Sequence, residues 1–459
     1  MSIKKFFGDK NFYKLVIGIA MPIMIQNGIT NLVNLLDNIM VGRLETEAMS
    51  GVTIVNQFIF IFNLVVFGAL SSAGIFTAQF HGLGDKDGVR NTFRFKIIIV
   101  LAVTLICIGI FVGFDDELIS LFLHESDQKG DLALTLKYGK EYLSVILIGL
   151  IPYALSQSYA STLRETGKTT LPMIASLVAV FVNFVLNYIL IFGKFGAPAL
   201  GVSGAAVATT VSRFFELAII VVFSHKDEKI AYFARGAYKT FKIPSSLIFA
   251  IALRGLPLMV NEVLWSIGVT FTNQCYSVRG LGVVAALNIS STIANLFNIV
   301  YIALGSAISI IVGNLLGAGK IKEAKETDTK LIAFSVLCSA GIAVFLGACS
   351  RVFPMLYNTT DEAKEIASFM IIVYAFMLPV HAFAHAAYFT IRSGGRVFIT
   401  MLLDSGFMWV FMIPVAFVLA NFTNISIFYL YFICQSLDLI KLIFASILLK
   451  RGTWARQLV

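Results

Sequence analysis

Charged side chains are scarce in this sequence, and their scarcity limits what the chain can be. Only 13% of its 459 residues are Asp, Glu, Lys or Arg, while 58% are hydrophobic. A soluble protein of this length needs a mixed, charged surface, and the sequence lacks the residues to make one. No polar stretch is long enough for a separate soluble domain, so a large water-soluble fold is excluded.

Signatures of enzymes and ATP-driven proteins are missing as well. The chain has no Walker A sequence, dinucleotide fingerprint, HExxH or nucleophile elbow, which argues against an enzyme and against energy from bound ATP. Its five cysteines form no CxxC and lie in or at the ends of apolar runs, so we interpret them as packing residues. His381 and His385 share a helix face without an evident third ligand, so we expect them to line a polar cavity rather than bind a metal. We therefore expect no cofactor.

Long hydrophobic runs take the place of charge. Runs near twenty residues recur along the chain, which is the length that crosses a hydrocarbon core of about 30 Å. The first run has no cleavage site for a signal peptide, so we interpret it as a retained helix. The expected fold class is an all-α integral membrane protein with twelve transmembrane helices, at roughly 12–38, 50–80, 95–114, 138–160, 170–192, 200–224, 252–277, 283–315, 329–349, 366–391, 396–420 and 426–449.

The basic residues indicate how the chain lies in the membrane. With the N-terminus taken as cytoplasmic, 25 of the 35 Lys and Arg residues fall in tails and loops on that side, and eight fall on the other. The positive-inside rule then places both termini on the cytoplasmic side of the membrane. The net charge of +9 thus reflects orientation and not a nucleic-acid partner.

The two halves of the chain look related. A gap-free shift of 235 residues aligns Pro22 with Pro257 and Gly82 with Gly317, and 11 of the 63 pairs from Pro22 to Gly84 are identical. We predict two pseudo-symmetric six-helix lobes, with the cargo bound between them. The expected divisions are an N-lobe at 1–224, a cytoplasmic linker at 225–243 and a C-lobe at 244–459.

Five acidic residues fall inside predicted helices, where an unpaired charge is costly and usually functional. Glu216 lies one turn from Arg213 and Asp438 one turn from Lys441, so we interpret both as members of ion pairs within one helix. The other three acids have no basic residue within one turn, and we take them as functional candidates: Asp37, Glu262 and Asp404.

Polar side chains at spacings of three and four form stripes along several of the predicted helices. Five such stripes favour a shared wet cavity over interhelical hydrogen bonding alone. A carboxylate among amide and hydroxyl oxygens can bind a proton or a hard cation, and the stripes favour neither. The asparagines that we expect to line the cavity are Asn34, Asn38, Asn273, Asn288 and Asn295.

Several segments, in this order and spacing, make the chain resemble the multidrug and toxic compound extrusion (MATE) family. They include the segment from Asp37 to Gly42, the segment Gln79–Gly84, Arg164–Lys168, Gly201–Thr209, Pro257 with Glu262, and Gly452–Trp454. The resemblance implies two six-helix lobes in a bacterial inner membrane that export organic substrates in exchange for Na⁺ or H⁺.

The resemblance also implies where cations bind. In the N-lobe the site falls on Asp37, Asn183, Asn187 and Thr209, where some relatives carry a second Asp in place of Asn187. In the C-lobe it falls on Glu262 and Asp404, with Thr400 where some relatives carry Tyr. Coupling is not assigned to either lobe, and the possible Na⁺ at Asp37 is the only metal expected.

We therefore expect a secondary active exporter of drugs or organic cations, driven by Na⁺ or H⁺ antiport through alternating access. Its partners would be small cationic or neutral organic molecules and the bilayer, and the chain would act as a monomer. One alternative is a flippase or exporter of a specific secreted or lipid-linked metabolite, although such a cavity should be richer in Arg and Lys. A passive channel is a further alternative.

Overall fold

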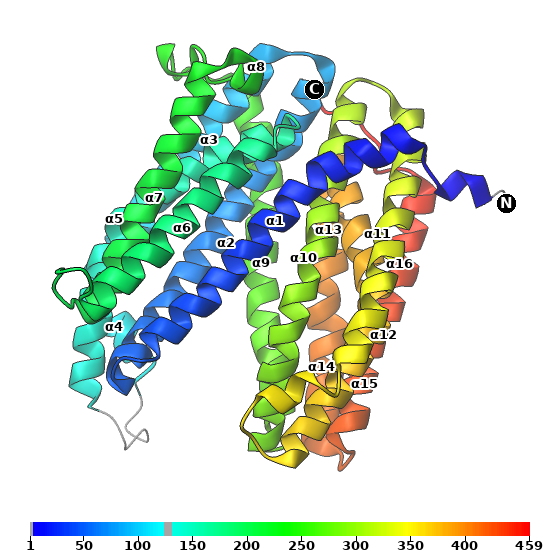
Figure 1. The fold of residues 1–459 in the computed structure, drawn as a ribbon. Coiled ribbons are helices and arrows are strands. Elements are labelled where there is room, and N and C mark those ends of the chain that lie inside the picture. Colours follow the sequence, from blue (N-terminus) through cyan, green and yellow to red (C-terminus); the bar gives the residue numbers. More distant parts are fainter. Residues whose placement is uncertain (1–2, 124–130) are drawn as a thin grey trace. The chain divides into compact units, whose positions relative to one another are not determined.

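A computed structural model describes residues 3–123 and 131–459, without the side chains of 3, 4, 34, 35, 38 and 39. Most of these residues are helical. Within these residues there is no β-strand, and twelve helices are long and apolar enough to cross a membrane. The prediction of an all-α membrane protein with twelve spans is confirmed. The spans are α1 (Lys10–Val41), α2 (Thr46–Leu83), α3 (Lys86–Gly113), α5 (Leu132–Glu165), α6 (Thr170–Phe192), α7 (Gly201–Lys226), α9 (Ser245–Ser277), α10 (Leu281–Gly317), α11 (Ile321–Cys349), α12 (Asp361–Ser393), Val397–Phe422 and Ile427–Arg451 (Figure 1).

The last two spans are each built from several elements. Span Val397–Phe422 comprises α13 (Val397–Met401), the π-helical stretches η4 (Leu402–Gly406) and η5 (Met408–Met412), and α14 (Ile413–Phe422). Span Ile427–Arg451 comprises α15 (Ile427–Ser436) and α16 (Asp438–Arg451). The short elements elsewhere are η1 (Ile3–Phe6), α4 (Asp115–Ser120), α8 (Glu228–Ala231), η2 (Ala237–Lys239) and η3 (Phe353–Leu356).

The helices form two compact units, which we name by the half of the chain that supplies most of each. The N-unit holds Ile25–Thr77 and Lys86–Gly255, and the C-unit holds Met1–Met24, Ala78–Asp85 and Leu256–Val459. Three helices therefore pass from one unit to the other. The passage in α1 follows Met24 and the passage in α9 precedes Leu256, so each lies within two residues of the proline inside that helix, Pro22 or Pro257.

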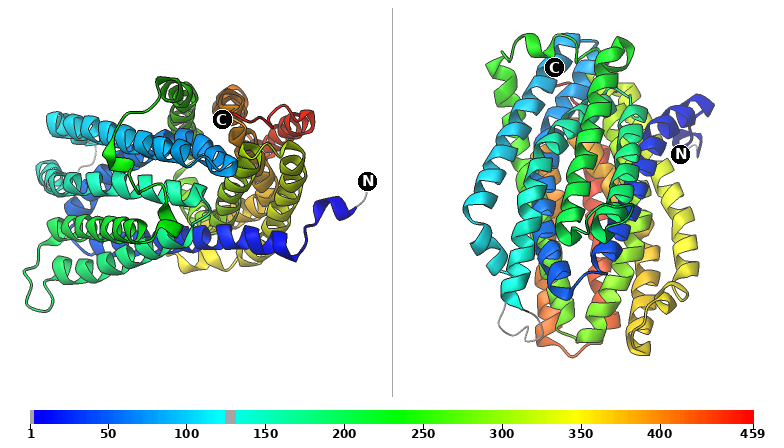
Figure 2. Two further views of the ribbon diagram at one scale, coloured as in Figure 1. Left: turned by 90° about the horizontal axis from the view of Figure 1, so that it is seen from above. Right: turned by 60° about the vertical axis from the view of Figure 1, so that its left-hand side comes forward.

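In the N-unit, α7 packs against both α5 and α6, and α3 packs against α5; Figure 2 shows these helices side by side. Small residues permit the close approach, as is usual where membrane helices pack. A Cβ on Gly204 of α7 would lie 2.7 Å from the Leu190 carbonyl oxygen of α6. The apolar core includes the fully buried side chains of Val55 and Ile119.

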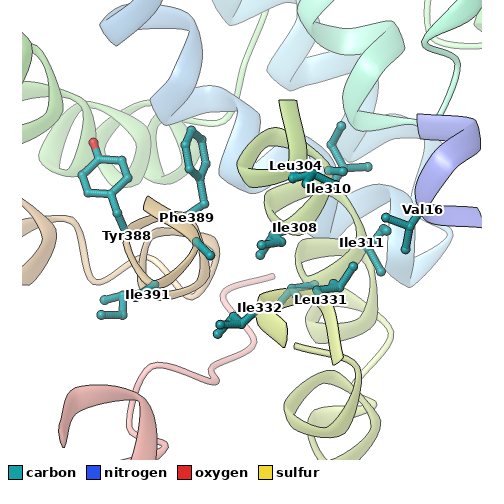
Figure 3. Packing of buried hydrophobic residues seen from close by; sticks show 14 of the residues in the cluster. Val16, Leu304, Ile308, Ile310, Ile311, Leu331, Ile332, Tyr388, Phe389 and Ile391 are labelled. Carbon is teal, nitrogen blue, oxygen red and sulfur yellow. The ribbon is translucent and has the colours of Figure 1, made fainter. Parts of the chain in front are cut away.

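In the C-unit, α12 packs against α10 and α11, and the start of α1 joins the same core. Figure 3 shows Val16 of α1 packed with side chains of α10, among them Leu304 and Ile311, in a cluster that Leu331 of α11 also enters. The first residues of the chain are thus tied to helices formed near its end.

A reciprocal contact between the two sequence repeats lies inside the C-unit. A Cβ on Gly82, near the end of α2, would overlap the Asn314 carbonyl of α10, and a Cβ on Gly317 would overlap the Gln79 carbonyl. The shift of 235 residues pairs these same positions, Gly82 with Gly317 and Gln79 with Asn314. The duplicated pattern therefore corresponds to a two-fold contact in which each repeat needs its glycine.

The segment that we expected to be a polar linker is folded against the N-unit. Residues 227–242, which we call the linker cap, follow α7 and contain α8 and η2. Arg94 of α3 donates hydrogen bonds to the carbonyls of Gly236 at 2.9 Å and Ala237 at 2.8 Å. Phe233 is fully buried, and its ring centroid lies 4.8 Å from the ring centroid of Phe93. The linker cap is therefore part of the N-unit's packing.

Candidate functional site

The N-unit brings together the four residues expected to form its cation site. Asp37 lies near the end of α1, Asn183 and Asn187 lie one turn apart on α6, and Thr209 lies on α7. Asn187 donates from Nδ2 to Asp37 Oδ1 at 2.6 Å. The Asn183 amide lies 3.1 Å from both Asp37 oxygens. With its NH₂ turned to the acid, it donates to them and accepts from Thr209 Oγ1 at 3.2 Å.

The groups that form hydrogen bonds with Asp37 are neutral amides. Asn183 and Asn187 are only 5% and 1% exposed, and Asn187 Oδ1 is a buried acceptor without a hydrogen-bond partner among the described residues. Arg213 influences Asp37 through its charge but forms its own ion pair with Glu216, at 3.2 Å. Asp37 therefore has no directly paired base in the described part of the chain, and its neighbours offer amide and hydroxyl oxygens.

The C-unit surrounds its acid differently. Asp404 lies in η4, and its Oδ1 accepts from the Lys441 ammonium of α16 at 2.8 Å. Its Oδ2 accepts from Asn261 Nδ2 of α9 at 3.3 Å. Glu262, the next residue on α9, is partly exposed and interacts with Asp404 and Arg392 through charge. Thr400 is fully buried and donates to the Val397 carbonyl of its own helix at 2.8 Å, so it does not bond to either acid.

The two predicted ion pairs have different outcomes. The pair Arg213–Glu216 is confirmed. Lys441 instead forms its ion pair with Asp404, and Asp438 is bound by His381 Nε2 at 3.0 Å. The contact between His381 and an acid of α16 was not predicted, and the expectation that His381 lines a polar cavity stays a prediction.

Asn261 and Ser405 are site residues that the sequence analysis did not identify. Ser405 Oγ lies 2.7 Å from Asn261 Oδ1 and 2.8 Å from the Asn261 carbonyl oxygen, and both residues are almost fully buried. Their adjacency to Glu262 and Asp404 in sequence was the available signal. Together they fix the amide that bonds to Asp404.

The backbone around Asp404 is unusual. Residues 402–406 and 408–412 are π-helical, a conformation that occurs mostly as short interruptions and frequently at functional sites. Trp409 in η5 donates from its indole nitrogen to the Leu264 carbonyl of α9 at 3.0 Å. The widened helix therefore docks on α9, the helix that carries Asn261 and Glu262.

The asparagines expected to line a cavity are not packed inside a unit where the structure describes them. Asn273 on α9 and Asn288 and Asn295 on α10 are exposed. The side chains of Asn34 and Asn38 lie outside the described residues. Among the described residues, no three His, Cys, Asp or Glu side chains gather in a group that could hold a metal ion.

Comparisons with known proteins agree with this architecture. The family model MatE matches residues 22–189 and 257–418, one segment in each half. A probable multidrug resistance protein NorM of Thermotoga maritima is 26% identical over 421 residues, covering 90% of this chain and 87% of that protein. The probable multidrug resistance protein YoeA of Bacillus subtilis is 24% identical over 415 residues, covering 88% and 86%.

Solved structures share the fold. The Vibrio cholerae MATE transporter VcmN in its bent form superposes with a TM-score of 0.85 at 16% identity, covering 96% of this chain and 97% of that chain. A MOP superfamily transporter from Pyrococcus furiosus, described as having a binding pocket of reverse polarity, gives 0.82 at 18% identity and 98% coverage of both. Since the family model covers most of both halves, the chain belongs to the MatE, or multidrug and toxic compound extrusion, family of membrane transport proteins and is not an enzyme.

Proposed function

We propose that this protein exports small organic molecules in exchange for Na⁺ or H⁺, and that the Asp37 site of the N-unit binds the coupling ion. One observation carries the proposal: a carboxylate lies among amide and hydroxyl groups with no base paired to it in the described residues. An intramembrane acid of this kind is expensive to keep charged, which makes a functional role the default.

The groups around Asp37 suit a monovalent cation. A proton neutralises the carboxylate directly, and a hard cation such as Na⁺ is bound by carboxylate, amide and hydroxyl oxygens. The partnerless Asn187 Oδ1 is one such oxygen beside Asp37. Either ion would remove the charge of Asp37 and so change which arrangement of α1, α6 and α7 is favoured.

The entry of one cation can balance the electrical cost of exporting another. Expelling a monovalent organic cation against the membrane potential costs about 2.3 kcal/mol per 100 mV, and one entering H⁺ or Na⁺ offsets that cost. The names of the relatives, which are multidrug resistance proteins, support small organic cargo. Amides, rather than bases, on the exposed faces of α9 and α10 support cargo that is cationic or neutral.

The orientation that we propose has both termini in the cytoplasm. Its support is the excess of 25 basic residues over eight in the tails and loops of the two sides. With this orientation the linker cap is cytoplasmic.

Transport by purified protein in vesicles tests the proposed coupling. Uptake of a fluorescent organic cation should saturate and should follow an imposed Na⁺ or pH gradient, and imposing the two gradients separately identifies the ion. We expect Asp37→Asn to lower gradient-driven uptake at least about tenfold, because the variant has no carboxylate to bind the coupling ion.

The matched control is Asp116→Asn, which removes one exposed acid from α4 that pairs with Lys140 at 2.9 Å. This control should retain wild-type uptake. Wild-type uptake by Asp37→Asn would overturn the proposal, and uptake that never saturates would indicate a channel.

A further inference from the structure

The acid of the C-unit is already engaged by a cation that the chain itself supplies. Lys441 Nζ lies 2.8 Å from Asp404 Oδ1, and the two side chains are only 17% and 22% exposed. The other Asp404 oxygen accepts from Asn261, which Ser405 holds in place. Both carboxylate oxygens therefore have donors, one of them an ammonium.

The charges around this pair come from three packed elements. Asp438, three residues before Lys441 on α16, is bound by His381 of α12 and is a second acidic neighbour of the ammonium. Glu262 of α9 and Arg392 of α12 act on each other through charge, and His385 of α12 is influenced by both Asp404 and Lys441. Among the residues that the structure describes, none around Asp404 offers a nearer cationic partner than Lys441.

An ammonium attached to the same unit competes strongly with free ions. A tethered group binds as if it were present at millimolar or higher concentration, without the entropy that a free ion loses. A Na⁺ ion at Asp404 would also have to share the carboxylate with a charge less than 3 Å away or displace it from partly buried surroundings. A Na⁺ ion would therefore have to compete with Lys441 for this acid.

We propose that Lys441 is a built-in counter-cation that fills the C-unit's acid site, so that Asp404 binds no Na⁺ until Lys441 is removed. The inference rests on the proposed function only in naming Na⁺ as a competing ion. It assigns the two units different tasks: the N-unit binds an exchangeable ion, while the C-unit keeps a permanent one.

Binding by the purified full-length protein tests this inference without any transport measurement. The background is Asp37→Asn, which removes the N-unit's acid, and the readout is the change in Tm when Na⁺ replaces N-methylglucamine at constant ionic strength. We expect Asp37→Asn alone to show no Na⁺ response. Adding Lys441→Met should create one, a rise in Tm of at least about 2 °C, because an ion that binds only the folded state stabilises it.

Two further variants identify the new site. Asp404→Asn, added to the Asp37→Asn/Lys441→Met protein, should abolish the Na⁺ response, whereas Lys441→Arg in place of Lys441→Met should never produce it. Lys441→Gln serves as the second test if Lys441→Met does not fold.

The inference is overturned by either of two results. One is a Na⁺ response in Asp37→Asn that Asp404→Asn removes, and this comparison needs no change at Lys441. The other is a folded Lys441→Met or Lys441→Gln protein without a response. Failure of Asp37-dependent transport would instead contradict the proposed function and leave these binding results in force.

Discussion

The two units solve the same electrostatic problem in different ways. In the N-unit, Asp37 is bound by neutral amides of α6 and has no directly paired base among the described residues. In the C-unit, Asp404 is bound by the ammonium of Lys441 as well as by an amide. Duplication of the helical scaffold has therefore not duplicated the surroundings of its acids. The residues that repeat between the two halves are not the acids and their partners.

The symmetric parts are those that hold helices together. Gly82 and Gly317 make reciprocal contacts at equivalent positions of α2 and α10. The same shift of 235 residues aligns Asp37 with Thr272 and Glu262 with Asn27, so neither acid has an acidic counterpart. These packing positions are equivalent in the two halves, whereas the acidic positions differ.

The largest expected effect compares the stability of two isosteric variants. Asp404→Asn leaves the Lys441 ammonium partly buried without its carboxylate, so we expect it to lower the free energy of unfolding by about 3 kcal/mol. Asp37→Asn leaves no directly paired base without its acid, so it should lower the free energy of unfolding by less than about 1 kcal/mol. Thermal unfolding in detergent measures both.

The double variant Lys441→Met/Asp404→Asn controls for the loss of the pair itself and should regain most of the lost stability. Equal losses of stability in Asp404→Asn and Asp37→Asn would contradict the difference between the two units.

An intermediate effect is expected from adding charge to the N-unit. Asn187→Asp places a second carboxylate beside Asp37, and the number of charged ligands sets the affinity of cation sites. We expect Na⁺ affinity to rise about tenfold, equivalent to about 1.4 kcal/mol. Isothermal titration with NaCl measures it. Asn421→Asp, at an exposed position of α14, is the matched control and should change nothing; a similar gain there would show that the effect is general charge.

The smallest expected effect distinguishes a hydrogen bond that only stabilises the fold from one that also takes part in ion-coupled transport. Ser405→Ala removes the hydroxyl that holds Asn261, so we expect a loss of stability of about 1 kcal/mol with transport unchanged. Thr209→Val, which removes a hydroxyl beside Asn183, should cost a similar amount but also slow gradient-driven transport, because its partner bonds to Asp37. Equal transport by both variants would contradict the assignment of coupling to the N-unit.

How far the sequence predicts the sites depends on how local each signal is. Asn183 and Asn187 are one turn apart on one helix, so their shared face was readable from spacing. The pairing of Lys441 with Asp404 joins two helices and had no local signal, and Asp438, three residues from Lys441, was the nearer partner in sequence. Spacing identifies neighbours on one helix, and tertiary packing chooses among acids on different helices.

The π-helical stretches limited the prediction in a second way. A helical face is inferred from a period of 3.6 residues, and a π-turn breaks that period because its hydrogen bonds run from i to i+5. Thr400 and Asp404 lie four residues apart, a spacing that places two side chains on one face of a regular α-helix. Instead Thr400 bonds within α13 while Asp404 lies in η4. The twelve helices themselves were predictable, since hydropathy and length are properties of each segment alone.

The passage of α1 into the C-unit has a consequence for synthesis of the chain in the cell. Val16 and its neighbours pack with α10, α11 and α12, helices whose residues are translated long after those of α1. The start of α1 therefore lacks its final neighbours until Leu304 and Leu331 have also been translated. Assembly of the C-unit thus joins a segment made before most of the N-unit to segments made after it.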